Sequence, residues 1–284
     1  CFMPEDAWTL DELAKEHGVT AVVDCGVAPG MSNMLAGYAA ASLDPCTNIE
    51  IYVGGLPRER RWPYEYKAGF SPYDVIEEYV RPSRIVEHGR VVVREALSEP
   101  ELMDFDGVGT LEAFNTDGLR SLAATLDVPF MKEKTLRYPG HIELMRVFRE
   151  TGLFGHEPID AGGVTVRPID VIQSLLFPKW TYEEGEEDLT VMRVLADGRR
   201  DGRDVRLTWD LLDFYDRASG ATSMSRTTAM PCTAMARLVA SGAFDQRGVI
   251  VPELVGRTSG MLDRVLGMLK ERGIVYHAAV TARD

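Results

Sequence analysis

The feature that most constrains the fold is an abrupt change from strand to loop to helix near the start of the chain. Residues 20–24 form a short apolar run that ends in Asp24, and Gly26, Pro29 and Gly30 follow within six residues. An alanine-rich segment with helical character comes next. Because the run is apolar on both faces and follows a helical segment, it is typical of the second half of a βαβ unit in a parallel sheet.

The residues before this run predict a helix. Pro4 suits the first turn of a helix, Leu10 and Leu13 belong to one apolar stripe, and Gly18 is a good helix stop. A parallel sheet rarely begins on a helix. We therefore expect the chain to be a fragment whose first strands lie upstream.

The remainder of the chain alternates hairpins and helices. We predict strands at 48–55, 84–95 (a hairpin around His88-Gly89), 107–115, 130–137, 188–214 (a second hairpin) and 274–280. We predict helices at 71–79, 119–126, 141–152, 227–240 and 259–271, and a solvated loop over the acidic run 183–188. The sequence therefore predicts α/β structure at both ends and α+β structure in the middle.

Composition excludes several classes of protein. A net charge of −13 argues against nucleic-acid binding and against an anionic membrane surface, and no apolar run approaches the roughly 18 residues of a membrane span. The four cysteines lie far apart without a CxxC pair, which argues against a disulfide framework or a metal site. We expect a cytoplasmic protein without a bound metal.

Four segments, in this order along the chain, carry a resemblance: DCGVAPGMSN (24–33), AFNTDGLRSL (113–122), TLRYPGH (135–141) and MSRTTAMPCTAMARLVASG (224–242). Together they resemble the saccharopine dehydrogenase-like family, and within it the bacterial lysine 6-dehydrogenases. The resemblance implies a Rossmann domain that binds NAD or NADP, an inserted α+β catalytic domain on a mixed β-sheet, and a C-terminal segment that returns to the Rossmann domain. It assigns residues 1–35, 36–223 and 224–284 to these three parts. The GxGxxG phosphate loop of such a domain is absent from the sequence.

The loop at 24–30 has two interpretations. In an open parallel sheet, ligands bind outside the carboxyl ends of the strands, so the loop can pack against the nicotinamide end of the cofactor and the substrate. The contacting residues would be Cys25, Gly26, Val27, Pro29 and Gly30. Asp24 would bind a substrate ammonium or act in proton transfer. The alternative is a tight connection with ordinary turn residues, in which Asp24 caps a helix or forms a salt bridge.

The TLRYPGH segment offers a candidate base and a candidate clamp. A neutral His141 at a helix N-terminus can act as a general base near pH 7. Arg137 can hold a substrate carboxylate through two hydrogen bonds, with Tyr138 beside it. The alternative is an arginine in a surface ion pair and a histidine that caps the helix.

Two further segments supply candidate substrate contacts. Asn115, Thr116 and Asp117 follow a predicted strand and can hold the amine and carboxylate groups of an amino acid, or Asp117 can cap the next helix. Arg226 precedes the helix in the last segment, which the resemblance places at the edge of the substrate cleft.

These features predict an NAD(P)-dependent oxidoreductase that acts on a CH–NH bond of a small amino acid. Oxidative deamination of lysine at its terminal amine is the first candidate, and secondary-amine chemistry of the saccharopine type is the second. A truncated assembly module without catalytic activity is the alternative from another class. We also predict a homodimer, because the long strands at 189–214 need a partner for an edge or a face.

Overall fold

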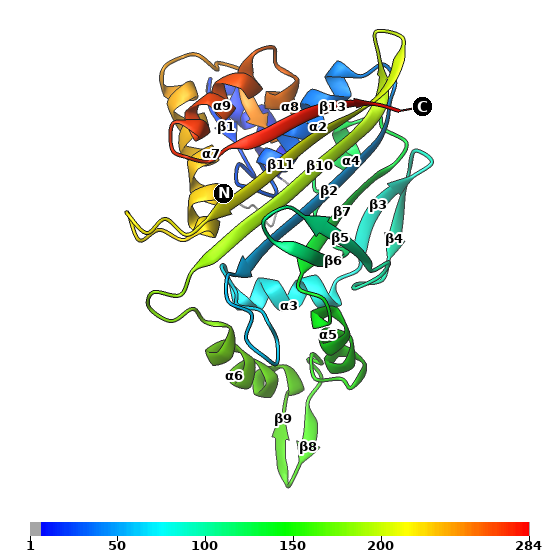
Figure 1. Cartoon of the computed structure of the whole chain (residues 1–284), viewed down its shortest axis with the longest axis vertical. Coiled ribbons are helices and arrows are strands. Elements are labelled where there is room, and N and C mark those ends of the chain that lie inside the picture. Colours follow the sequence, from blue (N-terminus) through cyan, green and yellow to red (C-terminus); the bar gives the residue numbers. More distant parts are fainter. Residues whose placement is uncertain (1–6, 284) are drawn as a thin grey trace.

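The computed structural model describes residues 7–283, and a mixed β-sheet forms the centre of the molecule (Figure 1). Among these residues nine strands belong to the sheet: β2 (Cys46–Pro57), β3 (Ser83–Glu87), β4 (Arg90–Arg94), β5 (Glu101–Phe105), β6 (Gly109–Asn115), β7 (Met131–Arg137), β10 (Asp188–Arg200), β11 (Arg203–Phe214) and β13 (Tyr276–Ala282). The main path runs β13-β11-β10-β2-β7-β3-β4, and the β5–β6 hairpin joins it at β7. The predicted mixed sheet is confirmed.

Strand β7 is the point where the sheet forks. It pairs in parallel with β2, while β3 meets it only at Met131 and β6 runs antiparallel along Lys134–Arg137. The segment that leaves β6 therefore crosses close to the middle of β7. This crossing positions the candidate site described below.

The long hairpin of β10 and β11 has no free edge. Strand β2 covers the outer edge of β10, and β13 covers the outer edge of β11. One face of the hairpin is also polar, because Arg193 pairs with Asp210 at 2.6 Å and Arg206 pairs with Asp197 at 2.7 Å. The argument that these strands lack a partner is therefore corrected: the remaining free edge of this part of the sheet lies at β13.

Helices cover the opposite face of the sheet. They are α2 (Met31–Ser42), α7 (Ser223–Ala240) and α9 (Met261–Lys270), which lie behind the strands in Figure 1. Their apolar side chains share one core with Ile51, Met192 and Val194, the inward residues of β2 and β10. None of the described helices is both long and apolar enough to span a bilayer.

A second core fills the lower end of the molecule in Figure 1. It lies under α3 (Pro72–Val80), α5 (His141–Glu150) and α6 (Pro168–Trp180), with the fully buried Trp180 in contact with Tyr64 and Tyr66. The two-stranded hairpin of β8 (Ile159–Ala161) and β9 (Val164–Val166) extends beyond it. The sequence interpretation did not include α6 or this hairpin.

The two ends of the chain meet in a small parallel pair. Strand β1 (Thr20–Val22) lies beside β12 (Gly248–Ile250), flanked by the helical segments η1 (Ala7–Leu10), α1 (Asp11–Glu16) and α8 (Pro252–Arg257). This pairing is the α/β unit that the sequence predicted for the two chain ends. The predicted helix start at Pro4 lies outside the described residues.

The expected return of residues 224–284 to the first domain stays a prediction, and the structure shows which elements these residues contact. Strand β12 pairs with β1, whereas β13 completes the large sheet beside β11, with Ala278 opposite Trp209 and Val280 opposite Leu207. Helices α7 and α9 pack on that same sheet. The outer edge of β11 presents backbone N–H and C=O groups, and the last strand of the chain pairs with them.

Candidate functional site

The loop after β1 is anchored by a buried acid. Asp24 has a left-handed backbone (φ 48°), and its carboxylate forms a 3.0 Å ion pair with Arg120. Arg120 belongs to the segment between β6 and the single turn of helix α4 (Leu122–Thr125). The ion pair therefore joins the N-terminal loop to the crossing beside β7.

The glycines of this loop are required because a side chain at either position would crowd neighbouring atoms. Gly30 has φ 140°, and a Cβ there would lie 2.1 Å from the Gly26 carbonyl oxygen. A Cβ at Gly26 would lie 3.3 Å from a methyl group of Thr228 in α7. The side chains of Cys25 and Val27 belong to the core. Of the five predicted cofactor contacts, Gly26 and Pro29 are partly exposed to solvent, and the other three are buried.

Alternate residues of β7 place a polar row on one face of the sheet. Met131, Glu133, Thr135 and Arg137 share this face because successive side chains of a strand alternate. The hydroxyl of Thr135 is 3.0 Å from that of Thr116, at the start of the crossing segment. Thr116 therefore lies beside the polar row, a position compatible with its predicted contact with the substrate.

Glu133 is the unsatisfied member of the row. Its side chain is buried, and its Oε2 atom has no hydrogen-bond partner. Gly118 lies so close that a Cβ there would be 1.9 Å from Oε1. Burial raises the pKa of Glu133 to about 8, repulsion from Glu78 and Asp117 adds to this, and Arg120 opposes it. A carboxyl of this kind holds a proton at neutral pH.

Arg137, by contrast, is fully satisfied. Its guanidinium contacts Glu78 at 2.6 Å and Tyr79 Oη at 3.2 Å, and it lies 4.4 Å from the ring centre of Tyr66. Only 2% of its surface is exposed. A substrate carboxylate would have to compete with Glu78, so these contacts do not support the clamp.

His141 is enclosed in the lower core. Its Nε2 is 2.9 Å from Tyr79 Oη, its Nδ1 is 2.9 Å from the Tyr64 carbonyl oxygen, and 2% of its surface is exposed. Burial and the charge of Arg137 lower the pKa of His141 to about 3. A base must reach the proton that it takes. In this geometry His141 positions Tyr79, and the structure gives no support to its role as the base.

Two other predicted contacts point away from the row. Asn115 lies opposite Lys134 on the other face of the sheet, where its Nδ2 donates to Ser98 at 3.2 Å. Tyr138 donates its hydroxyl to the Pro57 carbonyl oxygen at 3.0 Å. Both side chains are buried. Neither joins Thr116 and Glu133.

Asp117 borders a surface pocket of about 200 Å³. Its carboxylate is held by Arg84 at 2.8 Å, and although burial opposes the change, these hydrogen bonds lower its pKa. Arg120 lines the same pocket. The pocket therefore adjoins the segment that carries Thr116 and Gly118.

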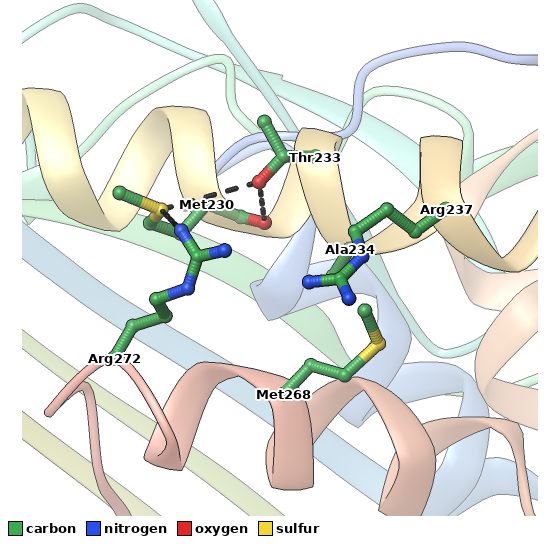
Figure 2. Close-up of a pocket in the computed structure, with 6 residues that line it drawn as sticks. All are labelled: Met230, Thr233, Ala234, Arg237, Met268 and Arg272. Carbon is green, nitrogen blue, oxygen red and sulfur yellow. Dashed lines mark hydrogen bonds between the residues drawn. The ribbon is translucent and has the colours of Figure 1, made fainter.

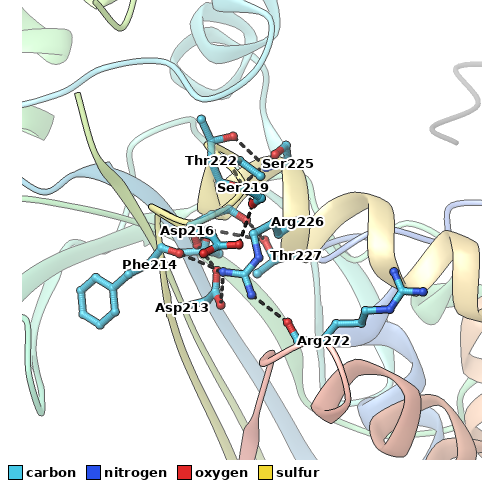
Figure 3. Close-up of polar contacts among 12 residues, drawn as sticks. Asp213, Phe214, Asp216, Ser219, Thr222, Ser225, Arg226, Thr227 and Arg272 are labelled. Carbon is cyan, nitrogen blue, oxygen red and sulfur yellow. Dashed lines mark hydrogen bonds and ion pairs between the residues drawn. The ribbon is translucent and has the colours of Figure 1, made fainter. Parts of the chain in front are cut away.

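Arg226 joins three parts of the fold through its guanidinium group (Figure 3). Its guanidinium lies 3.3 Å from Asp213, donates to the Phe214 carbonyl at 3.1 Å and donates to the Arg272 carbonyl at 2.9 Å. It thus joins the start of α7 to the end of β11 and to the turn after α9. The structure gives it no contact with the row on β7.

A separate hollow between α7 and α9 is too small for a substrate (Figure 2). It is lined by Met230 and Thr233 on α7 and by Met268 and Arg272 near α9. Its volume of about 10 Å³ is the size of one water molecule. The candidate site is therefore the area where Asp24, Arg120, Thr116 and Glu133 meet.

Sequence reasoning missed Glu133, although the sequence carries a signal for it. In the pattern of β7, the inward positions 133, 135 and 137 are all polar. Polar residues at consecutive inward positions of a strand indicate function rather than packing. This pattern identifies the row, but only the structure shows that Glu133 lacks a partner. Among the described residues, no group of three or more potential ligands is placed to hold a metal.

Comparisons with known proteins agree with this architecture. The structure of apo saccharopine dehydrogenase (L-Glu forming) from Saccharomyces cerevisiae is similar with a TM-score of 0.79, at 17% identity, over 99% of this chain and 78% of that one. The homospermidine synthase of Legionella pneumophila, solved in complex with NAD, is similar with a TM-score of 0.58, at 12% identity, over 99% of this chain and 68% of that one. The chain thus has the fold of saccharopine dehydrogenase.

Sequence similarity identifies the family. The pattern described as the saccharopine dehydrogenase C-terminal domain matches residues 26–274, and the chain belongs to this family. The mitochondrial alpha-aminoadipic semialdehyde synthase of Bos taurus is 23% identical over 96% of this chain and 37% of its own length. The carboxynorspermidine synthase of Vibrio cholerae serotype O1 is 25% identical over 69% of this chain and 48% of its own length. The chain spans just over a third of the length of the first of these relatives.

Proposed function

We propose that the chain is the substrate-binding part of an NAD(P)-dependent oxidoreductase that acts on a CH–NH bond of an amino acid. The observation that carries this proposal is the junction of Asp24, Arg120 and the polar row of β7, which gathers carboxyl and hydroxyl groups at one place. Carboxyl groups in that setting suit a cationic amine. Membership of the saccharopine dehydrogenase C-terminal domain family supports the same class of reaction.

The described residues do not by themselves fit a complete dinucleotide. The sequence contains no GxGxxG motif, and the glycines at 26 and 30 close on their own loop. Gly26 and Pro29 remain as contacts for the nicotinamide end, and the phosphates would be held outside this sequence. We therefore derive no reaction step through the cofactor.

Lysine, oxidised at its terminal amine, is the first candidate substrate. Secondary-amine chemistry is the second, and it is favoured by relatives whose names refer to saccharopine and carboxynorspermidine. The test supplies the complete protein with NAD or NADP and either L-lysine or saccharopine and follows nicotinamide reduction. Turnover of lysine alone selects the first candidate, and turnover of saccharopine alone selects the second. If neither is oxidised, the assembly-module alternative is favoured.

We also propose that the protein forms a homodimer through the free edge of β13. This seven-residue strand carries no Asp, Glu, Lys or Arg, and Val280 is 58% exposed. Such an edge is a template for pairing with a second copy. We expect a dimer mass by sedimentation at micromolar concentration and dissociation in Val280→Lys. A monomer in the unaltered protein contradicts the proposal.

A further inference from the structure

Glu133 is a buried carboxyl for which the fold provides no partner. Its Oε2 atom is enclosed without a hydrogen bond, although the neighbouring residues Thr116, Thr135 and Arg137 all have partners. Burying a polar atom without a hydrogen bond is unfavourable, and among the described residues Glu133 Oε2 is the one carboxyl oxygen in this situation.

The charged groups around Glu133 are already committed elsewhere. On α3, Glu78 forms an ion pair with Arg137, and on the crossing segment Arg120 pairs with Asp24 while Asp117 pairs with Arg84. The charges around Glu133 therefore form three ion pairs, and Glu133 is the one carboxyl among them without a counter-charge. A cationic amine that arrived there could pair with Glu133 without breaking any of these ion pairs.

We propose that Glu133 receives the amino nitrogen of the substrate and takes a proton from its ammonium form, a role that rests on the proposed amine-oxidising function. The N–H bond breaks, its electron pair stays on nitrogen, and an O–H bond forms on the carboxylate. The products are a neutral amine and a neutral carboxyl, so no charge is left buried.

The setting of Glu133 suits this transfer. An alkylammonium has a pKa of about 10.4 and an ordinary glutamate about 4.3, so the transfer to an ordinary glutamate is unfavourable by roughly six pKa units. The raised pKa of Glu133, about 8, reduces that gap to roughly two and a half units. Because Glu133 holds a proton at neutral pH, it first releases that proton to solvent, and the carboxylate so formed takes a proton from the bound ammonium. The balance is one proton released to solvent for each amine bound.

Gly118 places bare backbone against the carboxyl of Glu133. A Cβ at this position would lie 1.9 Å from Oε1, so any side chain there displaces the carboxyl. Gly118→Ala is therefore a second variant that moves the group without removing it. Glu50→Gln is a matched control, because Glu50 lies on neighbouring β2 and pairs with Lys132 at 3.2 Å on the other face of the sheet.

The experiment measures amine binding by titration calorimetry in buffers of different ionisation heat. The probes are L-lysine, cadaverine and L-norleucine, which lacks the terminal amine. We expect lysine and cadaverine to release nearly one proton at pH 7 and to bind more tightly as pH rises from 6 to 8. In Glu133→Gln, proton release disappears and amine affinity falls at least tenfold, while norleucine is unaffected; Gly118→Ala shows the same direction, and Glu50→Gln behaves as the unaltered protein.

The outcomes separate this inference from the proposed function. If cadaverine releases the proton but lysine does not bind, the role of Glu133 stands and lysine is excluded as substrate. If the complete protein oxidises lysine and Glu133→Gln retains both binding and turnover, the function stands and the role of Glu133 is overturned. If no amine binds, or binding releases no proton, the inference is overturned as well. A carbon NMR titration of the glutamate carboxyls checks that a midpoint near 8 disappears in Glu133→Gln.

Discussion

At the scale of single residues, two of the ionisable side chains that β7 buries, Arg137 and Glu133, differ in whether they have a partner. Arg137 has Glu78, Tyr79 and Tyr66 around its guanidinium, whereas Glu133 stays protonated because nothing neutralises it. The first arrangement stabilises the fold, and the second leaves a group available for chemistry. Both arrangements should affect the free energy of unfolding.

Glu133 should make the protein less stable as pH rises. Its pKa is about 8 in the folded state and about 4.5 when exposed, so the unfolded chain releases the proton first. Each pKa unit corresponds to about 1.4 kcal/mol, so the free energy of unfolding should fall by a few kcal/mol between pH 4.5 and 8. Denaturant unfolding at several pH values should show a smaller fall in Glu133→Gln. Parallel pH profiles of the two proteins would contradict the raised pKa.

Arg137→Ala should destabilise the fold rather than only weaken substrate binding. The substitution leaves the carboxylate of Glu78 without its 2.6 Å partner, and breaking a buried ion pair from one side costs roughly 3–5 kcal/mol. Adding Glu78→Gln to the same protein should recover part of that loss. A double-mutant cycle measured by denaturant unfolding gives the coupling free energy between Arg137 and Glu78. If stability is unchanged and only the KM of the complete enzyme rises, the original clamp prediction is favoured.

At the scale of elements, two glycines set the distance between α2 and α8. A Cβ at Gly37 would lie 2.1 Å from the Glu253 carbonyl oxygen, and a Cβ at Gly256 would lie 1.9 Å from the Met34 carbonyl oxygen. The backbones therefore touch. This contact also buries Glu253, whose carboxylate accepts a 2.6 Å hydrogen bond from Thr125 of α4. The packing thus connects the unit of β1 and β12 to the segment beside the site.

Gly37→Ala should separate these helices, and Gly267→Ala should not. Overpacking of a tight contact costs typically 1–3 kcal/mol, so we expect a lower melting temperature for Gly37→Ala. Gly267 lies in α9 with nothing within 4 Å of a Cβ, so alanine there should stabilise the helix by about 0.5–1 kcal/mol. Thermal unfolding of the two variants provides the comparison. Equal shifts would show that the α2–α8 contact is looser than described.

At the scale of the whole molecule, a further prediction concerns how tightly the chain binds the cofactor. The sequence contains no GxGxxG motif, and the glycines at 26 and 30 close on their own loop, so the 284-residue chain should bind NAD and NADP weakly or not at all. Calorimetric titration of both cofactors measures this. Sub-micromolar affinity for either one would show that this chain holds the phosphates by residues that we have not identified.

Much of the architecture was predictable because it depends on local pattern. Alternation predicted β2, β7 and the β10–β11 hairpin, the Ser71-Pro72 pair predicted the start of α3, and His88-Gly89 predicted the turn between β3 and β4. Strand β5 and helix α6 were missed. The LMDF run of β5 is short, and Pro178 lies inside α6, so neither has a strong local signal.

What the sequence determined by itself is therefore the identity of most strands and helices. Only the tertiary structure decided which strands share an edge and which buried polar groups find partners. Arg137 and His141 were identified from the sequence and Glu133 was not, and the packing of Tyr66 and Tyr79 enclosed the first two. Glu133 alone of the three was left unpaired, because the crossing segment presents the bare backbone of Gly118 to it. Whether a buried polar group finds a hydrogen-bond or ion-pair partner depends on contacts between segments far apart in the chain. A local sequence pattern does not contain this information.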